Sequence, residues 1–170
     1  MCNFLSALVL KNGDVLMHPL LDAHHDLVQY FRLPDDNAYV HHFAKVELTP
    51  HDHDWLDPSL WVWRVDEAVL PAWWDDVKNQ AEATLRARAG RMIVKDGDHH
   101  RLIVDGCWII GGTAMVHDVR GGRIQRVQDS AQIHGVGGSA QIHGVWDSAQ
   151  IHGVWGSAQI HGVWDSAQIH

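Results

Sequence analysis

The sequence predicts an α+β N-terminal domain followed by a C-terminal parallel β-solenoid. From Asp129 to His170 the chain repeats a nine-residue unit of the form (Asp/Gly)-Ser-Ala-Gln-Ile-His-Gly-Val-Trp with little variation. Nine residues are too few for a repeat of two helices, and Gly with β-branched Ile and Val favours a short strand and a tight turn. Such strands gain stability by stacking on identical neighbours, which a solenoid provides.

The first part of the chain mixes strand and helix signals. Asn12-Gly13 between two apolar segments is typical of a β-hairpin. A short helix is expected over residues 23–31 with Asp22 as its N-cap, and a long helix over residues 71–89, which Gly90 ends. The remaining expected strands are residues 40–48, 61–65, 92–94 and 102–104. The elements up to residue 94 are placed in a domain of residues 1–98 that caps the first coil, and residues 102–104 lead into the solenoid.

The solenoid is expected over residues 99–170, with clear repeats from Gly112. The first residue of each unit alternates between Asp and Gly, which predicts an eighteen-residue period with two nine-residue units per coil. Asp would then line one corner of the coil and Gly the other. Ala, Ile and Val are expected inside, with Gln, His and Trp outside, and Gly144 is expected to mark a bulge or bend. The coil is either flattened and two-faced or triangular.

Stacked coils would align identical side chains into rows. His134, His152 and His170 are expected on one side, with His143 and His161 on the other. Imidazole titrates near neutrality and binds metals, but one row does not supply the four tetrahedral ligands of zinc, so a surface row without metal is preferred. Trp146, Trp155 and Trp164 form either an apolar contact surface or flat rings that cover the turns.

Composition limits the possible partners. The 170-residue chain has a formal net charge of −8 and no basic patch, which argues against nucleic-acid binding. Its two cysteines form no disulfide framework, no apolar segment predicts a membrane span, and the opening MCNFLSALVL lacks the basic region of a signal peptide. We therefore expect a cytoplasmic protein without a signal peptide, and we expect no nucleic acid, membrane or cofactor.

Two groups of residues suggest chemistry. After removal of Met1, Cys2 would be an N-terminal nucleophile whose amine serves as base, with His24, His25, His41 or His42 as a partner. Against this, the glutamine-amidotransferase opening has Gly after Cys, whereas Asn3 follows here. His51 and His53 lie in a His-Asp-His-Asp segment, and both residue types bind metal ions. Four consecutive residues, however, cannot all reach one ion. A small buried cysteine and a solvated loop are the preferred interpretations.

The segments MCNFLSALV, NGDVL, DAHHDLVQYF, FAKVELTP and WVWRVDEAVLPAWWD, together with the SAQIHGV repeats, span nearly the whole chain. This combination is similar to a group of uncharacterised bacteriophage and actinobacterial proteins with a small N-terminal domain and variable SAQV-like tandem repeats. The resemblance implies a phage-related setting and outward positions tuned to different partners, and it implies no particular activity.

We expect a non-enzymatic, phage-associated structural or binding protein. Its solenoid would mediate self-assembly or partner recognition: a homo-oligomer would form through an uncapped last coil or the Trp rows, and another protein is the other possible partner. Two alternatives stay open. One is a hydrolase of the N-terminal-nucleophile type at Cys2, and the other is an inhibitor that acts on a host protein by shape.

Overall fold

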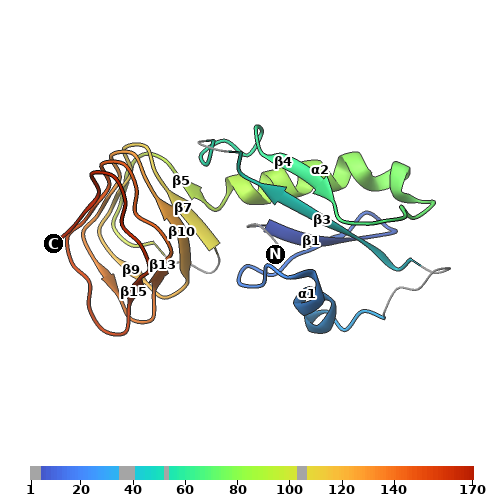
Figure 1. Ribbon diagram of the computed structural model, residues 1–170, viewed down its shortest axis with the longest axis horizontal. Coiled ribbons are helices and arrows are strands. Elements are labelled where there is room, and N and C mark those ends of the chain that lie inside the picture. Colours follow the sequence, from blue (N-terminus) through green and yellow to red (C-terminus); the bar gives the residue numbers. More distant parts are fainter. Residues whose placement is uncertain (1–4, 35–40, 52–53, 103–106) are drawn as a thin grey trace. The chain divides into compact units, whose positions relative to one another are not determined.

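The computed structural model describes residues 5–34, 41–51, 54–102 and 107–170 (Figure 1). The chain divides into two compact units, Met1–Gly90 and Arg91–His170. The sequence analysis places the boundary after residue 98. In the structure, β5 (Ile93–Val94) and β6 (Asp98–His99) pair in parallel with later solenoid strands, so residues 93–99 contribute to the solenoid sheets.

The first unit contains an antiparallel sheet of four strands in the order β2-β1-β3-β4. These strands are β1 (Leu5–Leu10), β2 (Val15–Leu16), β3 (Phe43–Thr49) and β4 (Val62–Val65). The expected hairpin joins β1 to β2, and Gly13 supplies the left-handed conformation of the turn with φ of 87°. The central strand β1 is buried over Leu5–Val9, whereas β3 alternates between buried and half-buried residues after Ala44.

Two helices accompany this sheet. Helix α1 (His24–Tyr30) is shorter than expected, and its N-cap is Ala23 without a side-chain cap bond, so the assignment of Asp22 as the cap was wrong. Helix α2 (Trp74–Gly90) confirms the long helix, and its first turn carries Asp75 and Asp76, which suit a helix N-terminus. Its buried residues recur every three or four positions, as an amphipathic helix requires: Trp74, Val77, Ala81, Leu85 and Ala89.

The second unit is a parallel β-solenoid of about four turns. Two five-stranded parallel sheets run along it, in the orders β15-β13-β10-β7-β5 and β16-β14-β11-β8-β6, and β12 pairs with β9. The strands not yet given are β7 (Cys107–Ile110), β8 (Met115–Val116), β9 (Val119–Arg120), β10 (Arg123–Val127), β11 (Gln132–Ile133), β12 (Val136–Gly137), β13 (Gln141–Ile142), β14 (Gln150–Ile151), β15 (Gln159–Ile160) and β16 (Gln168–Ile169). Leu102 of the expected strand 102–104 forms a single bridge with Val119, and residues 103–104 lie outside the described part of the chain.

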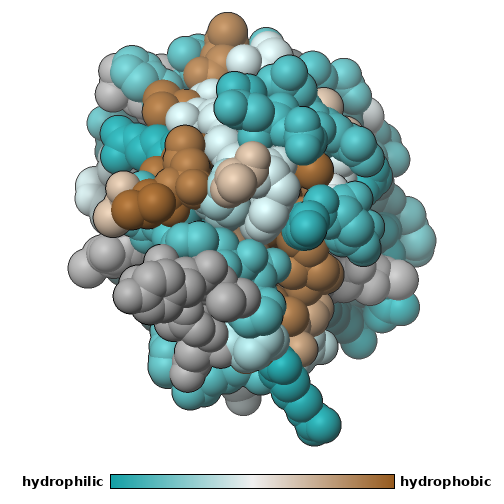
Figure 2. Space-filling view, turned by 90° about the vertical axis from the view of Figure 1, so that its right-hand side faces the viewer, coloured by the Kyte–Doolittle hydropathy of each residue, from teal (hydrophilic) through white to brown (hydrophobic). Residues whose placement is uncertain are grey.

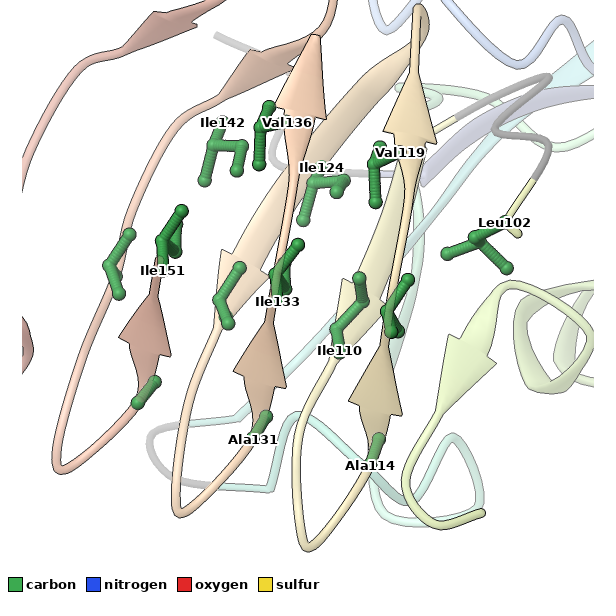
Figure 3. Packing of buried hydrophobic residues seen from close by; sticks show 14 of the residues in the cluster. Leu102, Ile110, Ala114, Val119, Ile124, Ala131, Ile133, Val136, Ile142 and Ile151 are labelled. Carbon is green, nitrogen blue, oxygen red and sulfur yellow. The ribbon is translucent and has the colours of Figure 1, made fainter. Parts of the chain in front are cut away.

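The Ala, Ile and Val positions of the repeat point into the solenoid, as predicted (Figure 3). Ile133, Ile142 and Ile151 are each 0% exposed, and the Val positions of the inner coils are equally buried. Each coil therefore contributes the same few aliphatic side chains to a continuous core. Because burial of such a side chain stabilises by about 1.5–3 kcal/mol, stacking compensates for strands only two residues long.

The corners of the coil explain the alternation of Asp and Gly. Asp129, Asp147 and Asp165 all have φ of 59–60°, and Gly138 and Gly156 have φ of 65° and 71°. Asp tolerates this left-handed region better than most residues, and here its carboxylate also caps the coil below. The amide N–H of Gly112 donates to Oδ2 of Asp129 at 2.8 Å, and the amide of Asp129 donates to Oδ2 of Asp147 at 3.2 Å.

Hydrophobic residues on the surface shown in Figure 2 form separate patches among hydrophilic side chains. In the first unit the exposed large hydrophobic residues are Leu20, Tyr30, Leu60, Val69 and Leu70. Among the described residues, no helix has both the length and the apolar character needed to cross a lipid bilayer.

Candidate binding groove on the solenoid

The glycine that follows His in each repeat leaves space for an indole ring to pack against the backbone. A Cβ atom at Gly135 or Gly137 would overlap the ring of Trp155, and a Cβ at Gly162 would overlap the ring of Trp164. Gly144 does interrupt pairing, since β13 ends at Ile142 and the next bridge is at Val145. Its missing side chain also makes room for the rings of Trp146 and Trp164, a role that the bulge interpretation did not include.

The tryptophans lie in two rows. Trp146 and Trp164 stack with ring centroids 4.1 Å apart and an interplanar angle of 14°. Arg126 extends this row, with its guanidinium 4.4 Å from the ring of Trp146. Burial lowers the pKa of Arg126, and the carboxylates of Asp147, Asp129 and Asp165 oppose that shift.

Trp155 belongs to the other row. Its neighbours there are Val136 and Gly137, because Val136 bridges to Val154. The Trp155 side chain is 47% exposed, so part of a large aromatic surface remains available for contact. The ring of Trp155 therefore covers glycines and remains accessible at the same time.

The histidine rows form as predicted. The rings of His134 and His152 meet edge to face with centroids 5.3 Å apart, those of His152 and His170 stack at 5.5 Å, and those of His143 and His161 are tilted at 5.0 Å. The first row continues upstream to His117, 4.7 Å from His134, and to His100, 6.1 Å from His117. Within the described parts of the chain, these rows bring no three metal-ligand atoms within 4.8 Å of one another.

A groove of about 530 Å³ opens where this histidine row meets Trp155. Its lining residues come from two successive coils and from Trp155, which reaches back over the coil between: His100, Arg101, His117, Asp118, Arg120 and Trp155. Asp118 orients both arginines, since one of its carboxylate oxygens lies 3.2 Å from Nε of Arg101 and 3.0 Å from Nε of Arg120. The arginine side chains stay 54% and 58% exposed, so their guanidinium groups can contact a ligand as well.

The groove depends on a departure from the repeat. Gly137 ends the unit Asp129–Gly137 where the later complete units have Trp, and it pairs with Arg120 in the coil below. A Trp at position 137 would occupy the space over which the Trp155 ring now lies. The Gly at the end of this unit is the sequence signal that could have located the groove. The sequence analysis did not consider Arg101 and Arg120, which accompany it.

Of the residues with predicted chemistry, the structure describes His51 and the histidines considered as partners of Cys2, including His24. Cys2 and His53 lie outside the described residues, so the structure gives no geometry for the expected nucleophile or for the second histidine of the loop. His51 is exposed just after β3. His24 is buried in α1 with Nε2 3.0 Å from the carbonyl oxygen of Val46.

Comparison with known proteins adds no assignment. No protein-family model, curated protein or solved structure matches this sequence.

Proposed function

We propose that the protein is a non-enzymatic binding protein whose solenoid recognises an acidic segment of a partner protein. The groove formed by Arg101, Arg120 and Trp155 carries this proposal. Two exposed guanidinium groups beside an accessible indole can bind carboxylates and an adjacent apolar group at once. Trp and Arg are also the residue types that contribute most to protein interfaces.

The charge distribution supports an acidic partner. Residues 1–90 carry 7 Lys/Arg and 14 Asp/Glu, whereas residues 91–170 carry 6 and 7, so the solenoid is nearly neutral. Among the lining residues, two arginines face one aspartate, while Nε2 of His117 already lies 2.7 Å from Oδ1 of Asp98. The groove is therefore locally cationic in an acidic chain, and a carboxylate-rich segment would be attracted to it.

The phage-related setting, in the host-cell cytoplasm or in a virion, is part of this proposal and rests on the sequence resemblance alone. Inhibition of a host protein by shape would use the same groove.

We also infer that each nine-residue unit forms half a coil. Gln141 pairs with Gln159, and Gln150 pairs with Gln168, each eighteen residues further along. Strands β13 and β14 start nine residues apart and belong to different sheets. In such an arrangement, alternate units face the same side of the solenoid, and the groove is lined by these units only. Gly137 in place of Trp would then change the surface on that side alone.

The test uses a fluorescein-labelled polyglutamate peptide and the full-length chain, with binding followed by fluorescence polarisation. The variant Arg101→Gln/Arg120→Gln is expected to lose at least about tenfold in affinity. The matched control is Arg91→Gln/Lys95→Gln, which removes two positive charges from exposed residues of the same unit outside the groove. Trp155→Ala should weaken binding as well, whereas Trp164→Ala, in the other row, should not.

Equal losses in the groove variant and in the charge control would show that binding follows net charge and would overturn the proposal. So would the absence of peptide binding by the wild-type chain at low ionic strength. Circular dichroism of each variant confirms that the comparison is made between folded proteins.

A second candidate function is self-association through the coil that contains β15 and β16. These strands end their sheets, and Val154, Val163 and Ile169 are 38%, 44% and 39% exposed, although the equivalent residues of inner coils are fully buried. An identical edge from a second copy would cover these residues and pair with the unpaired backbone groups.

Light scattering over a concentration series tests this second proposal. Wild type is expected to form dimers or larger assemblies, and Val154→Lys/Val163→Lys is expected to remain monomeric. The matched control is Val69→Lys/Leu70→Lys, which adds two charges at exposed apolar residues of the first unit. A monomeric wild type, or a Val154→Lys/Val163→Lys variant that assembles like wild type, would refute it.

A further inference from the structure

His24, Glu47 and Asp66 bring three metal-ligand atoms together in the first unit. One ligand atom from each residue lies within 4.8 Å of those of the other two, and no other group of three does so in the described ranges. The three residues come from different elements: His24 begins α1, Glu47 lies in β3, and Asp66 directly follows β4. Chain proximity therefore does not explain the cluster.

The imidazole of His24 has the orientation of a metal ligand. The residue is 5% exposed, and its Nε2 lies 3.0 Å from the carbonyl oxygen of Val46, which can only accept a hydrogen bond. Nε2 therefore carries a proton and donates it to Val46. A backbone carbonyl that receives the distal N–H is the usual support of a metal-binding histidine, because it fixes the ring and its tautomer.

The other ring nitrogen faces the carboxylates. Nδ1 of His24 lies 3.4 Å from Oδ2 of Asp66. Two ligand atoms bound at 2.0–2.2 Å to one tetrahedral ion lie about 3.3–3.5 Å apart. The observed separation therefore already matches one edge of a tetrahedral site, with Glu47 close enough to supply a third ligand.

The strands on which the carboxylates lie are held in fixed register. Glu47 pairs with Arg64 across β3 and β4, and Val46 pairs with Val65. The amide of Asp66 continues this ladder by donating to the carbonyl oxygen of Lys45 at 2.8 Å. Both carboxylates are thus attached to a rigid sheet, and the same strand that carries Glu47 orients the imidazole through Val46.

Charge and exposure favour a cation with one position open to water. Two carboxylates meet one imidazole, in a unit where acidic residues outnumber basic ones by two to one. The side chain of Asp66 is 66% exposed, so an ion can enter from solvent. Mixed imidazole and carboxylate ligands suit zinc and manganese rather than calcium or copper(I).

We propose that Nδ1 of His24 and the carboxylates of Glu47 and Asp66 bind a divalent transition-metal ion of the Zn²⁺ type. The competing explanation is a plain His24–Asp66 ion pair, which needs no contribution from Glu47. The site lies in a different compact unit from the groove, so its test does not depend on the proposed recognition of a partner.

The test is calorimetric titration of the full-length, metal-free chain with Zn²⁺. Wild type is expected to show one site that is tighter than the rest, because exposed histidines elsewhere in the chain bind zinc only weakly. Glu47→Gln/Asp66→Asn keeps the side-chain shapes and is expected to weaken this site by at least about tenfold. Asp26→Asn/Asp76→Asn is the matched control, since it removes two exposed carboxylates of the same unit outside the cluster and should leave the tight site intact.

A second measurement locates the metal without relying on variants. Zinc at one equivalent is expected to shift the ¹⁵N resonance of His24 Nδ1 in a long-range NMR correlation spectrum, and to leave the resonances of the solenoid histidines in place. An unchanged His24 resonance would overturn the proposal. So would equal zinc affinity in Glu47→Gln/Asp66→Asn and the control, or the absence of a tight site in wild type.

Discussion

The Asp corner of the solenoid predicts a specific order among substitutions of Asp147. Its backbone has φ of 60°, and its Oδ2 accepts the amide of Asp129 from the coil below at 3.2 Å. Asp147→Ala removes the hydrogen bond and places an ordinary L-residue in the left-handed region. Asp147→Gly removes the hydrogen bond alone. Asp147→Asn keeps an acceptor oxygen and the tolerance for this conformation, and it removes the charge.

The magnitudes follow from these separate contributions. The left-handed conformation costs an Ala about 1–2 kcal/mol. The hydrogen bond is long and exposed, so its loss costs about 0.5–1 kcal/mol, the lower half of the usual range. We expect Asp147→Ala to lower the free energy of unfolding by about 2 kcal/mol, Asp147→Gly by about 1 kcal/mol, and Asp147→Asn by less than about 0.5 kcal/mol.

Urea unfolding followed by tryptophan fluorescence measures this order, because Trp146 and Trp164 stack next to the Asp corner. The comparison requires equal m-values among the three variants. If Gly proves more destabilising than Ala, backbone conformation does not explain the residue at this corner. If Asn is as harmful as Ala, the charge of the carboxylate matters more than its hydrogen bond.

Two further substitutions test the solenoid core and its first corner. Ile133→Ala, at a fully buried position, should lower the free energy of unfolding by about 3 kcal/mol. Ile169 lies in the same row but is 39% exposed, so Ile169→Ala should lower it by less than half as much. Urea unfolding measures both. Gly112→Ala should cost more than about 3 kcal/mol in the same assay, since its φ is 59° and the new Cβ would overlap the carbonyl oxygen of Lys95; a cost under 1 kcal/mol would show that this corner shifts easily.

The repeat region was the more predictable half of the fold. Ala, Ile and Val face inward and the histidines form rows because a strand alternates its side chains and identical coils stack in register. The prediction of Asp22 as the helix cap was wrong because Ala23 takes the N-cap position, and the carbonyl oxygen of Asp22 accepts a bond from Oγ of the distant Ser6 at 2.6 Å. Which backbone group reaches a neighbouring strand depends on tertiary packing that propensities do not contain.

The groove and the metal cluster were less predictable. Gly137 was visible as an exception to the repeat, but its effect depends on the ring of Trp155 folding back by one coil. His24, Glu47 and Asp66 are separated by about twenty residues at each step and share no motif. Only the pairing of β3 with β4 and the placement of α1 bring them together, and single-sequence reasoning does not provide that register.

The alternating corners also determine how this chain can change in length. An insertion of eighteen residues adds one coil and leaves Asp over Asp and Gly over Gly, as in the pairing of Gln141 with Gln159. With each nine-residue unit forming half a coil, as proposed above, an insertion of nine residues would exchange the two sides for every later coil, so that Asp would lie over Gly and the amide caps of the Asp corner would be lost. Duplications and deletions during replication of such a gene would therefore be tolerated in steps of eighteen codons more readily than in steps of nine.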